Sequence, residues 1–129
     1  MVIGVPTEIK QDEYRVALTP AGARELVARG HEVLVQAGAG AGSAIADDDY
    51  VAQGAAIAPD AAATFAGADM IVKVKEPQPA EVALLEPRHL LFTYLHLAPD
   101  AELTGGLRNS GATCIAYETV TDGRGRLPL

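Results

Sequence analysis

Short hydrophobic runs alternate along the chain with stretches that have helical spacing. The runs predict strands over residues 2–5, 32–35, 55–58, 70–74, 90–95 and 113–117. Helices are predicted from Thr19-Pro20 to Gly30 and over residues 47–53, 59–66, 79–85 and 99–109. Strand and helix units of this length indicate an α/β fold with a mostly parallel sheet and helices on both faces. The strands are nearly continuous apolar runs, which is typical of a sheet that is covered on both faces.

Local signals fix some helix ends better than others. Thr19 suits an N-cap, Pro20 suits the first helical position, and Gly30 suits the end of that helix. Gly105 and Gly106 lie inside the helix predicted over 99–109, where each costs about 1 kcal/mol relative to Ala. That helix is therefore predicted less firmly than the first one.

Composition and charge exclude several classes of protein. The 129 residues fit one domain, and 49% hydrophobic residues are enough to build a core. A formal net charge of -7 argues against a nucleic-acid partner. No apolar run reaches the ~18 residues of a membrane span, and no signal peptide is visible.

The cysteine count and the chain ends give further expectations. Cys114 is the only cysteine, so an internal disulfide and a cysteine-based metal site are excluded, and we expect a cytoplasmic protein. The apolar end Leu127-Pro128-Leu129 has neither a helix cap nor a polar tail. We expect the natural polypeptide to continue beyond it.

Ionisable residues follow several of the predicted strands. Arg15 lies on the long loop after the first strand, Lys75 follows residues 70–74, His96 follows 90–95 and Glu118 follows 113–117. Ligands of open α/β sheets bind at the carboxyl ends of the strands. The sequence therefore predicts a site at this edge for an anionic substrate, with groups that can move protons.

Each candidate also has a structural interpretation. The planar guanidinium of Arg15 suits a carboxylate, but Arg15 can equally pair with Glu13 or Asp12 on the surface. Lys75 can polarise a carbonyl group. Lys73 shares its strand face, and we expect it to lie at a solvated edge.

The position of His96 distinguishes it from the other histidines. His31 and His89 precede strands, at the wrong end of the sheet, whereas His96 follows one and can serve as an acid or base. Tyr94 shares the face of His96 and can line the pocket or pack in the core.

The glycine-rich segment 38–42 follows a strand, as a dinucleotide-binding loop would. Its third glycine comes one residue early and Ser43 takes the expected place. We interpret the segment as a tight loop and expect no cofactor-binding residue in this chain.

Several motifs resemble the N-terminal domain that is shared by alanine dehydrogenases and the alpha part of nicotinamide nucleotide transhydrogenases. The resemblance runs over essentially the whole chain and rests on residues 3–8, 13–20, 30–33, 36–40 and 73–77. The segment 91–97, with His96, and residues 115–119 are similar to the alanine dehydrogenase branch, and so is Lys75. The resemblance implies a Rossmann-like but incomplete substrate domain.

The resemblance also implies roles for the candidate residues. Arg15 would grip the substrate carboxylate, Lys75 would contact that carboxylate or the keto oxygen, and His96 would act as general acid and base. Tyr94 and Glu118 would contribute to substrate binding. The implied reaction is the reversible, NAD-dependent conversion of L-alanine to pyruvate and ammonia, with no metal.

The remaining expectations concern the complete protein. Residues 1–129 would form the N-terminal substrate-binding domain, whereas an NAD-binding domain and a returning C-terminal segment would lie outside this chain. The chain alone would then be inactive, and the complete enzyme a homo-oligomer with neither a nucleic-acid nor a membrane partner. Two alternatives remain open: a transhydrogenase-type domain and a non-catalytic module that binds a small molecule.

Overall fold

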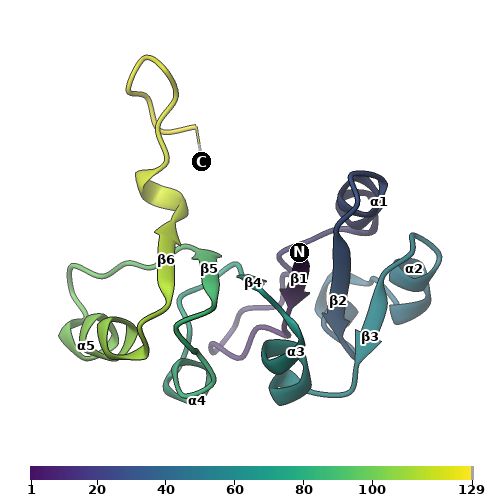
Figure 1. Ribbon diagram of the computed structural model, residues 1–129, viewed down its shortest axis with the longest axis horizontal. Helices are drawn as coiled ribbons and strands as arrows, with labels where there is room; N and C mark the ends of the chain where they lie inside the picture. Colours follow the sequence, from purple (N-terminus) through teal and green to yellow (C-terminus); the bar gives the residue numbers. More distant parts are fainter. Residues whose placement is uncertain (129) are drawn as a thin grey trace.

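The computed structural model describes residues 1–128, which form one parallel sheet and the helices around it (Figure 1). Leu129, the last residue of the apolar end, lies outside the described residues. The strands are β1 (Val2–Val5), β2 (Glu32–Gln36), β3 (Ala56–Ala58), β4 (Met70–Val72), β5 (Leu90–Thr93) and β6 (Thr113–Ala116). The α-helices are α1 (Pro20–Ala28), α2 (Asp47–Val51), α3 (Ala61–Gly67), α4 (Pro79–Val82) and α5 (Ala101–Ser110). Two 3₁₀ turns cover Ala41–Ser43 and Tyr117–Thr119.

The strand order β3-β2-β1-β4-β5-β6 shows a doubly wound sheet. All its strand pairs are parallel, which confirms the predicted fold class. The chain first builds outward from β1 to β3 and then returns to place β4 on the other side of β1. The switch point therefore lies between β1 and β4, where sheets of this kind bind their ligands.

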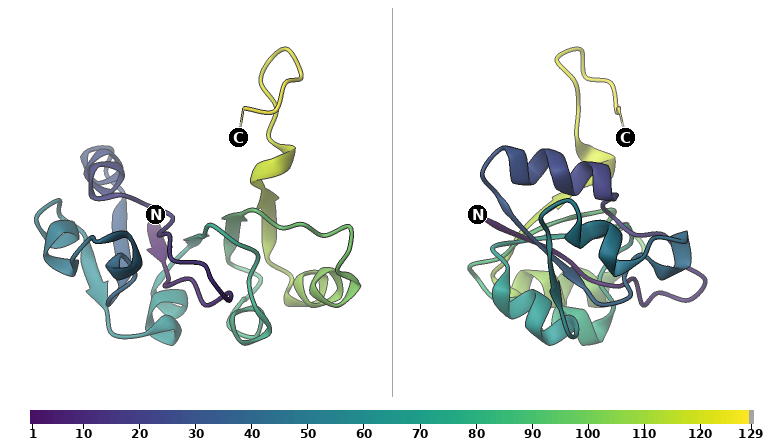
Figure 2. Two further views of the ribbon diagram at one scale, coloured as in Figure 1. Left: turned by 180° about the vertical axis from the view of Figure 1, so that it is seen from behind. Right: turned by 90° about the vertical axis from the view of Figure 1, so that its right-hand side faces the viewer.

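Helices cover both faces of the sheet, as predicted (Figures 1 and 2). On one face α3, α4 and α5 enclose a core that includes Phe65, Ile71, Leu91 and Leu107. On the other face α1 and α2 pack over β2 and β3, with Tyr50 fully buried. The close approach of α3 to β1 explains Gly4, since a Cβ there would lie 2.7 Å from Ala68 Cβ.

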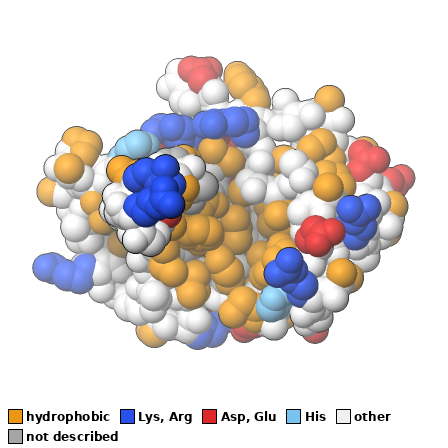
Figure 3. Space-filling view, turned by 90° about the horizontal axis from the view of Figure 1, so that it is seen from above, with side chains coloured by type: hydrophobic (Ala, Val, Ile, Leu, Met, Phe, Trp, Pro, Cys, Tyr) orange, Lys and Arg blue, Asp and Glu red, His pale blue; other side chains and the backbone are white. Residues whose placement is uncertain are grey.

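One half of the second face carries exposed apolar side chains. Ile71 and Leu91 point into the core with α3–α5, so Val72 and Phe92 point the opposite way by strand alternation. Ile115 pairs with Phe92 and is 39% exposed. Figure 3 views the molecule from above and shows hydrophobic side chains gathered in the middle of this face. Within residues 1–128, α1 and α2 lie over β2 and β3 and leave this half open.

The first helix has the predicted ends. The Thr19 side chain accepts a hydrogen bond from the Gly22 N–H, Pro20 is the first helical residue, and Gly30 follows the helix at φ 83°. The helix predicted over 99–109 begins at Ala101, because Asp100 is its N-cap and accepts from the Leu103 N–H. It runs through Gly105 and Gly106 to Ser110.

Two strands end two residues earlier than predicted, and just past each end a carboxylate binds a backbone N–H group. The strand predicted over 70–74 ends at Val72, and the Val74 N–H donates to Glu8 instead. The strand predicted over 90–95 ends at Thr93, and the Leu95 N–H donates to Glu118. Both carboxylates belong to the edge of the sheet at which the candidate site was predicted.

Candidate substrate site at the carboxyl edge of the sheet

The loops after β1, β4, β5 and β6 are neighbours because their strands are adjacent and parallel. The structure therefore brings Arg15, Lys75, His96 and Glu118 to one edge of the sheet, each from a different loop. Among residues 1–128 no group of three or more His, Cys, Asp or Glu side chains is arranged to hold a metal ion. No helix in the same part of the chain could cross a membrane.

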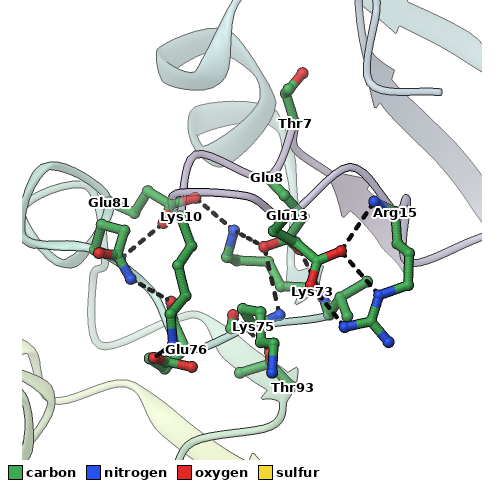
Figure 4. Close-up of polar contacts among 12 residues, drawn as sticks. Thr7, Glu8, Lys10, Glu13, Arg15, Lys73, Lys75, Glu76, Glu81 and Thr93 are labelled. Carbon is green, nitrogen blue, oxygen red and sulfur yellow. Dashed lines mark hydrogen bonds and ion pairs between the residues drawn. The ribbon is translucent and has the colours of Figure 1, made fainter. Parts of the chain in front are cut away.

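Arg15 binds the carboxylate of Glu13 with two side-chain hydrogen bonds (Figure 4). Nε lies 2.8 Å from Oε1 and Nη2 lies 2.6 Å from Oε2, while the Arg15 backbone N–H also donates to Oε1. These bonds to Arg15 lower the pKa of Glu13 from 4.5 to about 2. The pairing that sequence analysis kept as the structural alternative is therefore present. The pairing uses Nε and Nη2 of the guanidinium, and the Arg15 side chain is 62% exposed.

Lys73 is fully buried, so the prediction that it lies at a solvated edge is wrong. Its Nζ lies 3.1 Å from Glu8 Oε2 and 2.6 Å from Glu81 Oε1. The loop after β1 carries Glu8 over the end of β4, and α4 brings Glu81 from the other side (Figure 4). Burial raises the pKa of Glu81, and the Lys73 ammonium partly offsets that shift. We name Glu8, Lys73 and Glu81 the buried charge cluster.

The backbone of Lys75 is held from two sides. Its N–H lies 3.4 Å from Glu8 Oε2, and its carbonyl accepts a 2.8 Å hydrogen bond from the hydroxyl of Thr93, at the end of β5. The neighbouring Glu76 forms an ion pair with Lys10, from the loop after β1. Contacts to both neighbouring strands thus fix the loop that carries Lys75.

His96 has an unusual backbone, with φ at 50°. Glu118 Oε1 accepts hydrogen bonds from the N–H groups of His96, at 2.7 Å, and Leu95, at 3.1 Å. Partial burial alone would raise the pKa of Glu118, but these N–H groups outweigh it and hold the pKa below its usual range. The Glu118 carboxylate therefore holds the turn that carries His96. Because these hydrogen bonds go to backbone N–H groups, they position His96.

Aromatic rings surround His96 on one side. The Tyr94 ring stacks on the imidazole with centroids 6.0 Å apart, and Tyr117 packs edge-on against both Tyr94 and Phe92. Burial raises the pKa of Tyr117 to about 12. By contrast, His89 is buried far from this edge, where its ring contacts the Glu86 N–H and the Phe65 carbonyl. Its role is structural.

The glycine-rich segment forms a tight loop against the loop after β1, as predicted. A Cβ on Gly42 would lie 2.5 Å from the Tyr14 carbonyl oxygen, and the Ser43 hydroxyl donates to that same oxygen. The segment leads into the short turn Ala41–Ser43, and the five-residue helix α2 comes next. An open cavity of about 380 Å³ lies between the two loops, and Glu8, Glu13 and Arg15 contribute to its lining.

Sequence analysis did not identify Glu8, Glu13, Glu81 or Thr93 as parts of this site. The sequence suggested Glu13 only as a surface partner of Arg15. The one signal for Glu8 was its place as a carboxylate on the loop after β1. Glu8 and Lys73 are 65 positions apart in the sequence, so no local pattern pairs them. Only the strand order places these residues together.

A doubly wound parallel sheet with an arginine, a lysine and a histidine on the loops at its switch-point edge defines an α/β domain of the class that holds ligands at this edge. Residues 4–129 match the family model described as the alanine dehydrogenase/PNT N-terminal domain, and the chain belongs to this family. The match agrees with the resemblance in the sequence motifs.

Relatives align with the whole chain. It is 60% identical to an alanine dehydrogenase of Halomonas elongata and 54% identical to one of Mycobacterium tuberculosis, strain H37Rv. Each alignment covers 100% of this chain but 35% of the relative. The chain thus spans about a third of the length of these curated relatives.

Solved structures give the same result. An L-alanine dehydrogenase superimposes with a TM-score of 0.95 and 51% identity, covering 99% of this chain and 35% of that one. A transhydrogenase from Sinorhizobium meliloti has a TM-score of 0.88 and 28% identity, covering 96% of this chain and 37% of that one. The fold is common to both, and sequence identity favours the dehydrogenase.

Proposed function

We propose that this chain is the substrate-binding part of an NAD-dependent L-alanine dehydrogenase. The complete protein would convert L-alanine, water and NAD⁺ to pyruvate, ammonium and NADH, with release of a proton. The observation that carries the proposal is that Arg15, Lys75 and His96 lie on the loops after three adjacent strands, at the switch-point edge. The identity of 50–60% to alanine dehydrogenases along the whole chain supports it.

Arg15 and Lys75 would bind the substrate by its charge. Arg15 would present a planar guanidinium to the carboxylate, and Lys75 would contact that carboxylate or the keto oxygen of pyruvate. Two cations on different loops fix both the position and the orientation of the α carbon, which lowers the entropic part of the barrier. Tyr94 would line the same pocket beside His96.

His96 would move the proton. As ammonia adds to the keto carbon, or leaves it, a proton must pass to or from the substrate oxygen or nitrogen, and an imidazole is suited to both directions. Glu118 would act on this step through the backbone of His96, because its oxygens accept from the His96 and Leu95 N–H groups. This arrangement favours a positioning role for Glu118 over direct contact with the substrate.

The glycine-rich loop after β2 does not fit the phosphates of a nicotinamide cofactor. Gly42 packs against the Tyr14 backbone, and the glycine-rich loop leads into a three-residue turn, so neither a phosphate cradle nor a long helix follows β2. When bound, NAD supplies the acceptor for hydride from the α carbon. We propose that a further domain of the complete protein binds it.

The complete protein would also cover the open apolar face. Val72, Phe92 and Ile115 lie on the half of the sheet that α1 and α2 leave open, and a face of this kind needs a partner surface. We propose that a returning segment of the same polypeptide covers it. We further propose a cytoplasmic homo-oligomer for the complete enzyme.

The test is turnover by the natural protein that contains this chain. We expect L-alanine-dependent formation of NADH, and a loss of about 100-fold in kcat/KM for Arg15→Ala. Glu25→Ala, an exposed change on α1, is the matched control and should leave turnover unchanged. Hydride exchange between two nucleotides without alanine turnover would favour the transhydrogenase-type function instead. Pyruvate binding without any turnover would indicate the non-catalytic module.

A further inference from the structure

The buried charge cluster is costly and stands at the switch point. The side chains of Glu8, Lys73 and Glu81 are 1–3% exposed, so two carboxylates and one ammonium are removed from water there. Apolar residues of similar volume often stabilise a fold as well as a buried ion pair does. The need for a stable core therefore does not explain the buried charge cluster. The contacts of the cluster with the neighbouring backbone indicate another role.

Those contacts converge on the segment that carries Lys75. Glu8 Oε1 accepts a 2.6 Å hydrogen bond from the Val74 N–H, and Oε2 faces the Lys75 N–H at 3.4 Å. Thr93, which is fully buried, donates to the Lys75 carbonyl from the other side. Figure 4 shows Glu8 above this segment and Thr93 below it. Both polar groups of the Lys75 backbone therefore have a partner from a neighbouring strand end.

Glu8 also belongs to the loop that carries Arg15. Its carboxylate therefore joins the loop after β1 to the loop after β4, across the switch point. Lys73 and Glu81 hold that carboxylate in place: Lys73 Nζ lies 3.1 Å from it, and Glu81 holds the other side of the same ammonium. One buried group thus sets the spacing between the two cations proposed to grip the substrate.

We infer that Glu8 and Thr93 are positioning residues, which hold the Lys75 backbone so that its ammonium and the Arg15 guanidinium meet one substrate carboxylate. This inference rests on the proposed function. Glu8 acts through Val74 and Lys75, and Thr93 acts through the Lys75 carbonyl. Neither touches the substrate, so each affects binding only by moving Lys75.

The experiment compares Thr93→Val, Thr93→Ser and Glu8→Gln with the wild-type chain. Valine matches threonine in shape but lacks the hydroxyl, whereas serine keeps the donor. Two quantities are measured: pyruvate affinity by titration, and the NMR signals of the Lys75 side chain (Cε and Nζ) without ligand. The Arg24 side chain is the internal control for those signals, because it lies exposed on α1 and pairs with Glu25.

We expect Thr93→Val to weaken pyruvate binding by about tenfold or more and to move the Lys75 signals toward those of a free lysine. Thr93→Ser should restore both, and the Arg24 signals should stay unchanged throughout. Glu8→Gln should act in the same direction as Thr93→Val. If it fails to fold, the valine and serine pair decides the question alone.

Other outcomes separate this inference from the proposed function. Folded Thr93→Val with wild-type affinity and unchanged Lys75 signals overturns the positioning role. Equal losses in Thr93→Val and Thr93→Ser also overturn it, because the hydroxyl is then irrelevant. Failure of the wild-type chain to bind pyruvate would contradict the proposed function. The Lys75 signals would still show whether Glu8 and Thr93 fix that residue.

Discussion

The carboxylate of Glu118 accepts a 2.7 Å hydrogen bond from the backbone N–H of His96, a residue held at φ 50°. The contact joins the segment after β6 to the end of β5, and its charge compensates for a backbone conformation that most side chains avoid. Glu118→Ala should therefore lower the free energy of unfolding by about 1–2 kcal/mol. Urea denaturation checks this, with Glu25→Ala on the exposed face of α1 as control. Equal stability of Glu118→Ala and the control would contradict it.

The same backbone conformation gives a second prediction. A side chain at positive φ costs roughly 1 kcal/mol, which glycine avoids. His96→Gly should thus be more stable than His96→Ala by about that amount, although both lack the imidazole. Thermal unfolding of the two variants compares them directly. The opposite order would show that His96 is not held at positive φ in solution.

The pairing of Arg15 with Glu13 should be visible in a pH titration. Arg15 lowers the pKa of Glu13 from 4.5 to about 2. In the folded state the carboxylate therefore stays charged at pH values at which a free glutamate would take up a proton. The stability that it contributes is present above pH 4.5 and is lost as the pH falls toward 2. NMR of the Glu13 carboxyl should report this midpoint, and Arg15→Ala should return it toward 4.5. An unchanged midpoint in the variant would rule out the pairing.

Removal of Lys73 should be far more damaging than removal of Lys10, which is half-buried. Lys73→Met leaves Glu8 and Glu81 buried without a counter-ion, which costs about 3–5 kcal/mol. Lys10→Met, the control, breaks a partly exposed pair and should cost about 1 kcal/mol or less.

The Lys73 effect should depend on pH. Burial already raises the pKa of Glu81, and loss of the ammonium raises it further, so the penalty is largest at neutral pH. It should shrink as the pH falls and Glu81 takes up a proton. Denaturation at several pH values measures it, and a penalty that is small or independent of pH would contradict the account.

Two glycines should respond to alanine in opposite ways. Gly4→Ala places a Cβ 2.7 Å from Ala68 Cβ and should destabilise the fold by about 1–3 kcal/mol. Gly105→Ala meets no atom within 4 Å on α5 and should stabilise it by up to about 1 kcal/mol. Thermal unfolding of both variants checks the pair. A stable Gly4→Ala would mean that α3 does not approach β1 this closely.

Local signals predicted those elements whose ends depend on nearby residues. β1 has the predicted bounds, and α1 begins and ends where Thr19, Pro20 and Gly30 indicate. Strand and helix alternation was enough to predict the parallel sheet and the edge at which Arg15, Lys75 and His96 lie. These features follow from local conformational preferences and from the general geometry of α/β folds.

Features that depend on distant partners were not predictable. Just past the ends of β4 and β5, Glu8 and Glu118, each from a segment far along the chain, accept hydrogen bonds from the N–H groups of Val74 and Leu95. The burial of Lys73 has a similar cause, since its partners come from the loop after β1 and from α4. A single sequence shows the alternation of a strand but not which charged group folds over its end.

The most direct test of the central claim is a pyruvate titration of this chain followed by NMR, with Arg15→Ala as control. We expect shifts that cluster around Arg15, Lys75 and His96, saturate with pyruvate and vanish in the variant. A folded chain whose signals do not move would contradict the claim that these residues form a substrate site.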